Sequence, residues 1–229
     1  MILVSKIKLA AGAALAVTAL TLTACSSNDT GSASGSSAAP AATTTTTASM
    51  AAPTTSAASG GDGVTTAADT FGPNCKDLPA ADAPGGLTAM GPQPVATAAS
   101  TNPLLTKLVA AVGAVNGLGD TLNTAPAITV FAPADPAFAK LGDAKFAELA
   151  GQPAVLGPIL QFHVLGKRYD AKGLQAAGTV QSLNAAGGDI KIEGTGDNMT
   201  INGAKILCGN IPTKNATVFV IDTVLTPKA

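Results

Sequence analysis

The chain has 229 residues, of which 46% are hydrophobic, 3% aromatic and 12% charged, with a formal net charge of −1 at pH 7. This composition provides a core for one domain and leaves enough chain for a tail. The 13 basic residues form no stripe that could displace counterions from phosphates, so we expect no nucleic-acid partner.

The N-terminus has the order of an export signal. Two lysines precede an apolar run from Leu9 to Leu22, which is shorter than the roughly 20 residues that span a bilayer. A small residue, Ala24, then precedes Cys25. This succession predicts a lipoprotein signal peptide over residues 1–24, with Cys25 acylated as the mature N-terminus. An ordinary signal peptide that ends near a cysteine is the alternative.

Residues 25–70 consist mainly of Ser, Thr, Ala, Gly and Pro and contain almost no large apolar residue. Such a segment cannot offset its ordering entropy by burial, so we expect a disordered tether. Its threonine run, residues 43–47, leaves two interpretations open. The segment is either a plain spacer or a spacer whose hydroxyl groups also carry sugars.

Residues 71–90 remain rich in Pro and Gly and predict an irregular lead-in to a domain over residues 91–229. The lead-in contains Cys75, and the domain contains Cys208. These two cysteines form an even pair in an exported chain, where oxidation is expected. We therefore predict a Cys75–Cys208 disulfide that clamps the lead-in to the domain.

Residues 94–99 are predicted to form a short helical turn. A longer helix is predicted to open at Asn102, with an apolar stripe formed by Leu104, Leu105, Leu108, Val109 and Val112. Further helices are predicted from Asp143 and from Pro153, and the second one passes into a strand at about His163.

The stretch 128–138 predicts a buried strand that turns directly into a helix. Ile128, Val130 and Phe131 are β-branched or aromatic, and prolines bound the run. Asp135 stands immediately before a proline, which predicts a helix with Asp135 as its N-cap. Phe138 follows on the first turn and is expected to face the sheet.

The C-terminal third changes to short, partly alternating segments separated by Gly or Asn, which predict a β-meander over residues 179–208. Residues 216–225 form the longest apolar strand. The implied fold class is α+β, with a helical cluster between the early and late strands.

No common catalytic constellation is complete in this chain. There is a single histidine, so a His-rich metal site is excluded and a catalytic triad would have to use His163. Neither a Gly-x-Ser-x-Gly elbow nor a Gly-rich phosphate loop occurs. We therefore expect a protein that is not an enzyme and that needs no cofactor or metal.

Three stretches resemble the signature boxes of fasciclin (FAS1) domains: Thr129 to Phe138, Ile159 to Leu165, and Val218 to Leu225. Their order and spacing agree over about Gly91 to Pro227. With its lipoprotein signal, the chain resembles mycobacterial cell-surface lipoproteins and secreted immunogenic proteins that carry one fasciclin domain. The resemblance implies an α+β fold, a β-sandwich or wedge with a cluster of short helices. The residues that match the fold signature are Thr129, Phe131, Pro133, Asp135, Phe138, His163 and Asp222.

The second box departs from the family at Phe162, which replaces a tyrosine. One interpretation of His163 is a buried imidazole, hydrogen-bonded to the backbone or to a side chain near Asp135 or Thr129. The other makes Phe162 and His163 partner-binding residues, because this region of some animal fasciclin domains has been linked to integrin adhesion.

The resemblance implies an extracytoplasmic adhesion or recognition module and surface antigen, anchored to the bacterial cell membrane through lipid on Cys25. Shedding or secretion is a further route to the outside. We expect an extracellular or host protein as its partner. The alternative is a carrier for an apolar or lipid ligand, in which some helical Leu and Phe side chains line a groove.

Overall fold

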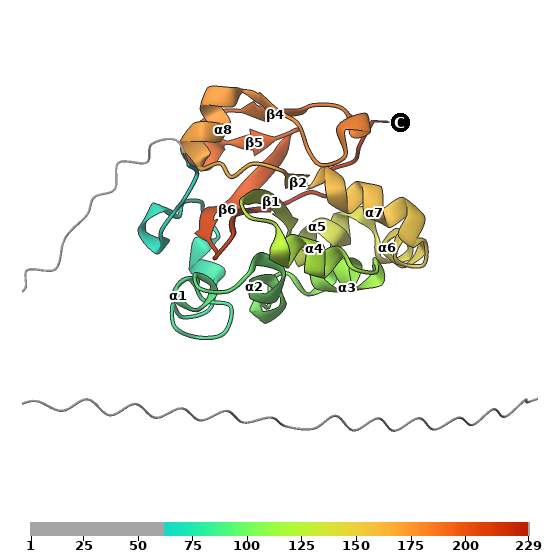
Figure 1. Ribbon diagram of the computed structural model, residues 1–229, viewed down its shortest axis with the longest axis horizontal. Coiled ribbons are helices and arrows are strands. Elements are labelled where there is room, and N and C mark those ends of the chain that lie inside the picture. Colours follow the sequence, from blue (N-terminus) through green and yellow to red (C-terminus); the bar gives the residue numbers. More distant parts are fainter. Residues whose placement is uncertain (1–61, 229) are drawn as a thin grey trace, which may run out of the picture. The chain divides into compact units, whose positions relative to one another are not determined.

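The computed structural model describes residues 62–228 (Figure 1). The predicted signal peptide 1–24, Cys25 and the predicted tether up to residue 61 lie outside the described residues. No helix within the described range is long and apolar enough to cross a bilayer.

Seven strands among the described residues form one sheet in the order β2-β1-β7-β6-β5-β4-β3. β1 is parallel to β7, and the other neighbouring strands are antiparallel. With the helices below, this confirms the predicted α+β class. The strands are β1 (Ile128–Pro133), β2 (Val164–Leu165), β3 (Thr179–Val180), β4 (Ile190–Glu193), β5 (Thr200–Ile201), β6 (Ala204–Pro212) and β7 (Ala216–Ile221).

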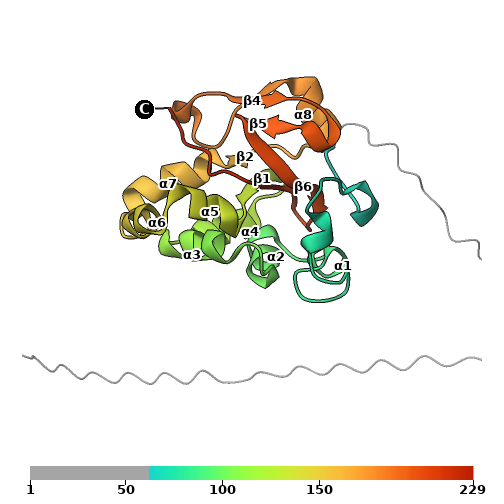
Figure 2. The same ribbon diagram turned by 180° about the vertical axis from the view of Figure 1, so that it is seen from behind.

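Most helices gather on one side of β1 and β6, whereas α8 lies beside β4 and β5 (Figures 1 and 2). They are α1 (Leu87–Met90), α2 (Val95–Thr101), α3 (Thr106–Ala114), α4 (Leu118–Thr124), α5 (Asp135–Leu141), α6 (Asp143–Ala150), α7 (Pro153–Phe162) and α8 (Ala171–Ala177). Four short 3₁₀ turns complete the described part: η1 (Ala67–Asp69), η2 (Cys75–Asp77), η3 (Ala185–Gly187) and η4 (Gly196–Asn198).

The central strands β1 and β7 are buried on both faces. Successive side chains of a strand point to opposite faces, so each strand supplies two separate core clusters. Val130 and Val218 belong to the cluster under the helices, whereas Phe131 and Phe219 belong to the cluster around α8 and β3–β5. This double burial explains why both strands are continuous apolar runs in the sequence.

The β6–β7 ladder shifts register between Cys208 and Ile211. Within this bulge, Asn210 adopts a left-handed conformation with φ of 57°. A bulge bends a strand and redirects its side chains. The Asn210 carboxamide accepts a hydrogen bond from the Ala171 amide at the start of α8, at 2.8 Å.

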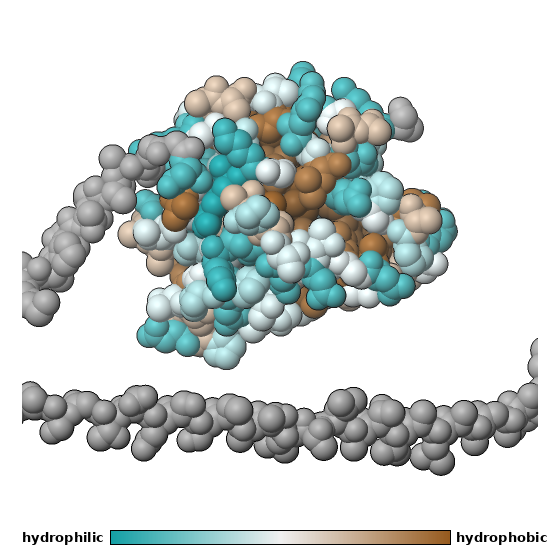
Figure 3. All heavy atoms as spheres, viewed as in Figure 1, coloured by the Kyte–Doolittle hydropathy of each residue, from teal (hydrophilic) through white to brown (hydrophobic). Residues whose placement is uncertain are grey.

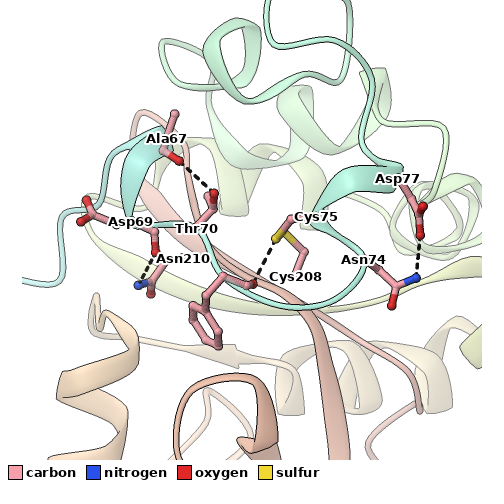
Figure 4. Close-up of a disulfide and its surroundings, with 9 residues drawn as sticks. Ala67, Asp69, Thr70, Asn74, Cys75, Asp77, Cys208 and Asn210 are labelled. Carbon is pink, nitrogen blue, oxygen red and sulfur yellow. Dashed lines mark hydrogen bonds between the residues drawn. A yellow bond between two sulfur atoms is a disulfide. The ribbon is translucent and has the colours of Figure 1, made fainter.

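The predicted disulfide between Cys75 and Cys208 is confirmed, with the Cα atoms 4.8 Å apart (Figure 4). It joins the lead-in to β6. The chain ahead of it is also ordered, because Gly63 O accepts from Thr217 Oγ1 at 2.7 Å and Asp69 O accepts from Asn210 Nδ2 at 3.1 Å. The predicted end of the tether at residue 70 is therefore too late. Composition could not show this, because the side chains that hold these two carbonyls lie about 140 to 150 residues further along the chain.

Candidate functional site: the signature residues and an adjoining cavity

Thr129 on β1 is fully buried and fastens the strand to the loop after β2. Its hydroxyl donates to Lys167 O and accepts from Tyr169 N, both at 2.8 Å. A buried hydroxyl with both roles filled is a structural hydrogen-bonding group. This explains a polar residue in the middle of an apolar strand.

Asp135 links two helices, although it does not cap its own. α5 begins at Asp135 itself, and Ala134 occupies the N-cap position. The carboxylate instead accepts from Thr106 Oγ1 at 2.6 Å and from Lys107 N at 2.9 Å, in the first turn of α3. The predicted N-cap role is thus wrong, because the side chain satisfies an orphan amide of the neighbouring helix.

Pro133 and Asp222 lie where the parallel strands end, since Pro133 pairs with Ile221. The Asp222 carboxylate accepts from Lys140 Nζ at 2.7 Å and from Lys205 N at 2.8 Å. Partial burial acts to raise the pKa of Asp222, but these hydrogen bonds outweigh it and hold the pKa below its usual value. Asp222 therefore ties α5, β6 and the end of β7 together.

The aromatic signature residues are core residues, as predicted. The rings of Phe131 and Phe219 are 6.0 Å apart between centroids. Phe138 and Phe146 form an edge-to-face pair at 5.0 Å, which joins α5 to α6.

His163 follows α7 and is only 2% exposed. Its Nε2 accepts from the Leu225 amide at 2.9 Å, so the ring proton resides on Nδ1 and is donated to Ile159 O at 2.8 Å. Burial lowers the pKa of His163 to about 4, although the bond to Ile159 O acts in the opposite direction. The imidazole is thus a neutral link between α7 and the C-terminal segment.

This placement selects between the two interpretations of the second box. Phe162 is 1% exposed, so neither it nor His163 presents a side chain to a partner. We therefore correct the prediction that they are direct partner contacts. The histidine also binds backbone atoms on both sides rather than groups near Asp135 or Thr129. Because both ring nitrogens are occupied, His163 has no free nitrogen for a catalytic triad.

A cavity of about 60 Å³ lies beside His163, between helices α2, α3, α4 and α7 and strands β1 and β2. Its walls are apolar apart from the imidazole, and include Leu108, Val112, Leu122, Val130 and Leu160. Figure 3 shows apolar surface where β1, β2, α4 and α7 meet. The chemistry of this cavity suits a hydrocarbon group and offers little to a polar ligand.

Asn215, in the turn between β6 and β7, was missed by the sequence reasoning. Its Oδ1 accepts from Val95 N at the start of α2, at 3.0 Å, and its Nδ2 donates to Leu122 O and Ala125 O at the end of α4, each at 2.8 Å. One buried amide thus holds two helix ends against the sheet. The signal available in the sequence was a polar Thr-Lys-Asn triplet between two apolar runs.

Within residues 62–228, no three His, Cys, Asp or Glu side chains lie close enough together to hold a metal ion. Hydrogen bonds and packing join the signature residues, which together form a junction between the helices and the sheet.

The fasciclin domain family matches residues 103–227, and the chain belongs to this family. It is 40% identical over 169 residues to the cell surface glycolipoprotein MPB83 of Mycobacterium bovis. The aligned region covers 71% of this chain and 74% of that protein. It is 39% identical over 169 residues to the immunogenic protein MPB70 of the same species, covering 85% of that protein.

A solved FAS1 domain pair from the insect cell adhesion molecule Fasciclin I has the same fold, with a TM-score of 0.50 and 19% identity. The match covers 58% of this chain and half of the insect chain.

Proposed function

We propose that the protein is a lipid-anchored surface antigen whose fasciclin domain acts in adhesion or host recognition. The observation that carries the proposal is the 40% identity, over 169 residues, to a protein described as a cell surface glycolipoprotein. The aligned length exceeds the matched domain, so the likeness includes segments outside residues 103–227. The basic, apolar and small-residue succession that ends at Cys25 supplies a means of anchoring.

The anchor is tested by the Cys25→Ser variant. We expect it to move from the detergent phase to the medium, because a thiol-linked lipid can no longer hold it at the membrane. The matched control is the Cys75→Ser/Cys208→Ser double variant, which lacks only the domain cysteines and should stay in the detergent phase. Detergent partitioning of Cys25→Ser like that of the unmodified sequence would contradict a lipid anchor.

Recognition is tested separately by adhesion of cells to surfaces coated with extracellular matrix proteins. We expect adhesion to fall in a deletion strain and to return with the full chain. The Cys25→Ser variant should not restore it, because the released domain no longer connects the cell to the surface. Equal adhesion of all three strains would argue against an adhesive role.

The second candidate function is a carrier for an apolar ligand, and the apolar cavity beside His163 favours it. Its volume of about 60 Å³ is well below the roughly 300 to 1,000 Å³ of ordinary ligand sites. An acyl chain would therefore enter only if the surrounding helices moved apart. For this reason we rank the carrier function below the recognition function.

Native mass spectrometry of protein purified from its own membrane tests the carrier function. A retained lipid should be present, and it should be lost when Ala96→Leu fills the cavity from α2. Ala147→Leu on the exposed face of α6 adds the same atoms outside the cavity and should retain the ligand. Protein that carries no ligand, or the same ligand in both variants, would contradict binding in this cavity.

A further inference from the structure

A second cleft, of about 390 Å³, opens on another part of the domain. It lies between the segment that precedes η1, helix α1 and the turn between β6 and β7. We call it the Arg168 cleft. Its polar lining residues are Thr65, Thr66, Thr88, Arg168, Thr213 and Lys214.

Arg168 is 8% exposed and is held by the β6–β7 turn. Its Nε donates to Thr217 Oγ1 at 3.0 Å, and its Nη2 donates to the carbonyls of Ala216 and Thr213 at 2.9 and 3.1 Å. Nη1 makes no hydrogen bond with any described residue. The guanidinium is thus fixed in orientation, and its Nη1 N–H groups remain able to donate hydrogen bonds to a ligand.

The charge of Arg168 also has no carboxylate within ion-pair distance in the described part of the chain. Burial lowers the pKa of Arg168, and the charge of Asp62 opposes this effect. The Asp62 carboxylate, however, accepts from the Val64 amide. A buried cation that is neutralised only at a distance is costly, and a bound anion removes that cost.

Thr65 supplies an independent observation on the same cleft. It is 6% exposed, and its buried Oγ1 has no hydrogen-bond partner among the residues described. Buried hydroxyls are nearly always paired, so an unpaired one on a residue that lines a cleft points to a missing ligand. Lys214 adds a second positive charge, since its exposed side chain lies on the β6–β7 side of the cleft.

We propose that the Arg168 cleft binds an oxyanion, either a carboxylate or a phosphate ester, through Arg168, Thr65 and Lys214. A guanidinium edge, a hydroxyl and an ammonium together match the several acceptor oxygens of such a group. A neutral sugar would satisfy the hydroxyl but leave the buried charge uncompensated. The inference stands apart from the membrane anchor and from the apolar cavity.

The test is a titration of the full chain, followed by ¹H–¹⁵N NMR, with sodium phosphate, glucuronate and glucose at constant ionic strength. We expect saturable shifts at Arg168 Nε–H and at the Thr65 and Lys214 amides with phosphate, glucuronate or both, and none with glucose. Saturation by phosphate alone identifies a tetrahedral ligand, and saturation by glucuronate alone identifies a carboxylate. The absence of saturable shifts with both anions overturns the proposal.

Two variants localise the binding. Thr65→Val removes Oγ1 at nearly constant volume, and should weaken anion binding about five- to tenfold without lowering the melting temperature, because the hydroxyl has no partner to lose. Lys214→Gln should weaken binding by a smaller factor, about threefold, because its charge is exposed.

The matched control is Lys145→Gln on α6, which removes one exposed lysine at the opposite end of the helical layer from α1 (Figures 1 and 2). Its anion affinity should equal that of the natural sequence. Equal weakening by the two lysine variants would show unspecific charge attraction and overturn the site. Unchanged affinity in Thr65→Val would do the same.

Discussion

His163 is the side chain at which the helical layer, the sheet and the C-terminus meet. Its neutral ring donates to Ile159 O through Nδ1 and accepts from the Leu225 amide through Nε2. Protonation would place a second N–H against the amide of Leu225, in a buried site whose other walls are apolar. The ring can therefore hold the C-terminal segment only while it is neutral.

The depressed pKa of His163 predicts a pH dependence of stability. The unfolded ring binds a proton near pH 6.5, whereas the folded ring binds it only near pH 4. Between these values the unfolded state binds more protons, so the free energy of unfolding falls as the pH drops from about 6.5 to about 4. The total loss is on the order of 3 kcal/mol, and above pH 6.5 this group contributes no slope.

Urea unfolding of the natural sequence and of His163→Gln at several pH values measures this effect. The variant lacks the titrating ring, so the difference between the two stabilities should shrink on acidification. Carboxylates such as Asp222 affect both proteins alike and cancel in the difference. A single histidine that titrates near pH 6.5 in the folded protein, measured by NMR, would contradict the buried assignment.

Asp135 gives a second prediction at this scale. Asp135→Ala removes the acceptor for the Lys107 amide and the Thr106 hydroxyl, and should lower the free energy of unfolding by about 1 to 2 kcal/mol. Asp135→Asn keeps an acceptor oxygen in the same place and should recover most of the loss. Chemical denaturation of the two variants checks this, and equal losses would show that the acceptor oxygen at this position is not what stabilises the start of α3.

Among the elements, the sequence predicted those with strong patterns. Strands β1 and β7 are continuous apolar runs, and α3, α6 and α7 carry apolar side chains at helical spacing. Helices α4 and α8 were missed because each is short and contains glycine, and α8 has only one large apolar side chain, Leu174. Such helices are determined by tertiary contacts, as with the α8 start fixed by Asn210.

The features of the candidate site also differ in whether the sequence could predict them. The cysteine pair and the aromatic core could be predicted from residue type, because apolar burial and disulfide pairing follow from composition and compartment. The partners of Asp135 and Asn215 and the Leu225 partner of His163 could not, since they are distant in the chain. The Arg168 cleft could not be predicted for the same reason, because its lining residues come from four separate segments of the chain, at residues 64–67, 87–91, 168 and 212–214.

The disulfide and the backbone hydrogen bonds of Phe71 and Asn74 join the lead-in to β6, and the disulfide gives a prediction for this segment. Reduction should lower the melting temperature by several degrees, because it frees a loop of 133 residues in the unfolded chain. Amides ahead of Cys75 should then exchange faster than those of β1 and β7. An intact-mass measurement that finds two free thiols in freshly isolated protein would contradict the bridge.

At the scale of the whole molecule, the folded unit is larger than the matched family region. The fragment 62–229 should unfold cooperatively. The fragment 71–229 loses the carbonyl partners of Thr217 and Asn210 and should be less stable by roughly 1 to 3 kcal/mol. The fragment 103–229 also lacks α1, α2 and Cys75, and should not fold. Circular dichroism during thermal unfolding ranks the three, and a stable 103–229 fragment would contradict this boundary.

The covalent bond between Cys75 and Cys208 also decides how the domain responds to mechanical load. Tension applied at residue 62 can straighten the chain only as far as Cys75, after which it passes through the sulfur atoms directly into β6. The covalent path then bypasses the intervening chain, which contains α1 to α8 and β1 to β5. The helices around the apolar cavity therefore lie outside the covalent path of the load when the N-terminal side is pulled, and reduction of the disulfide would place them in that path.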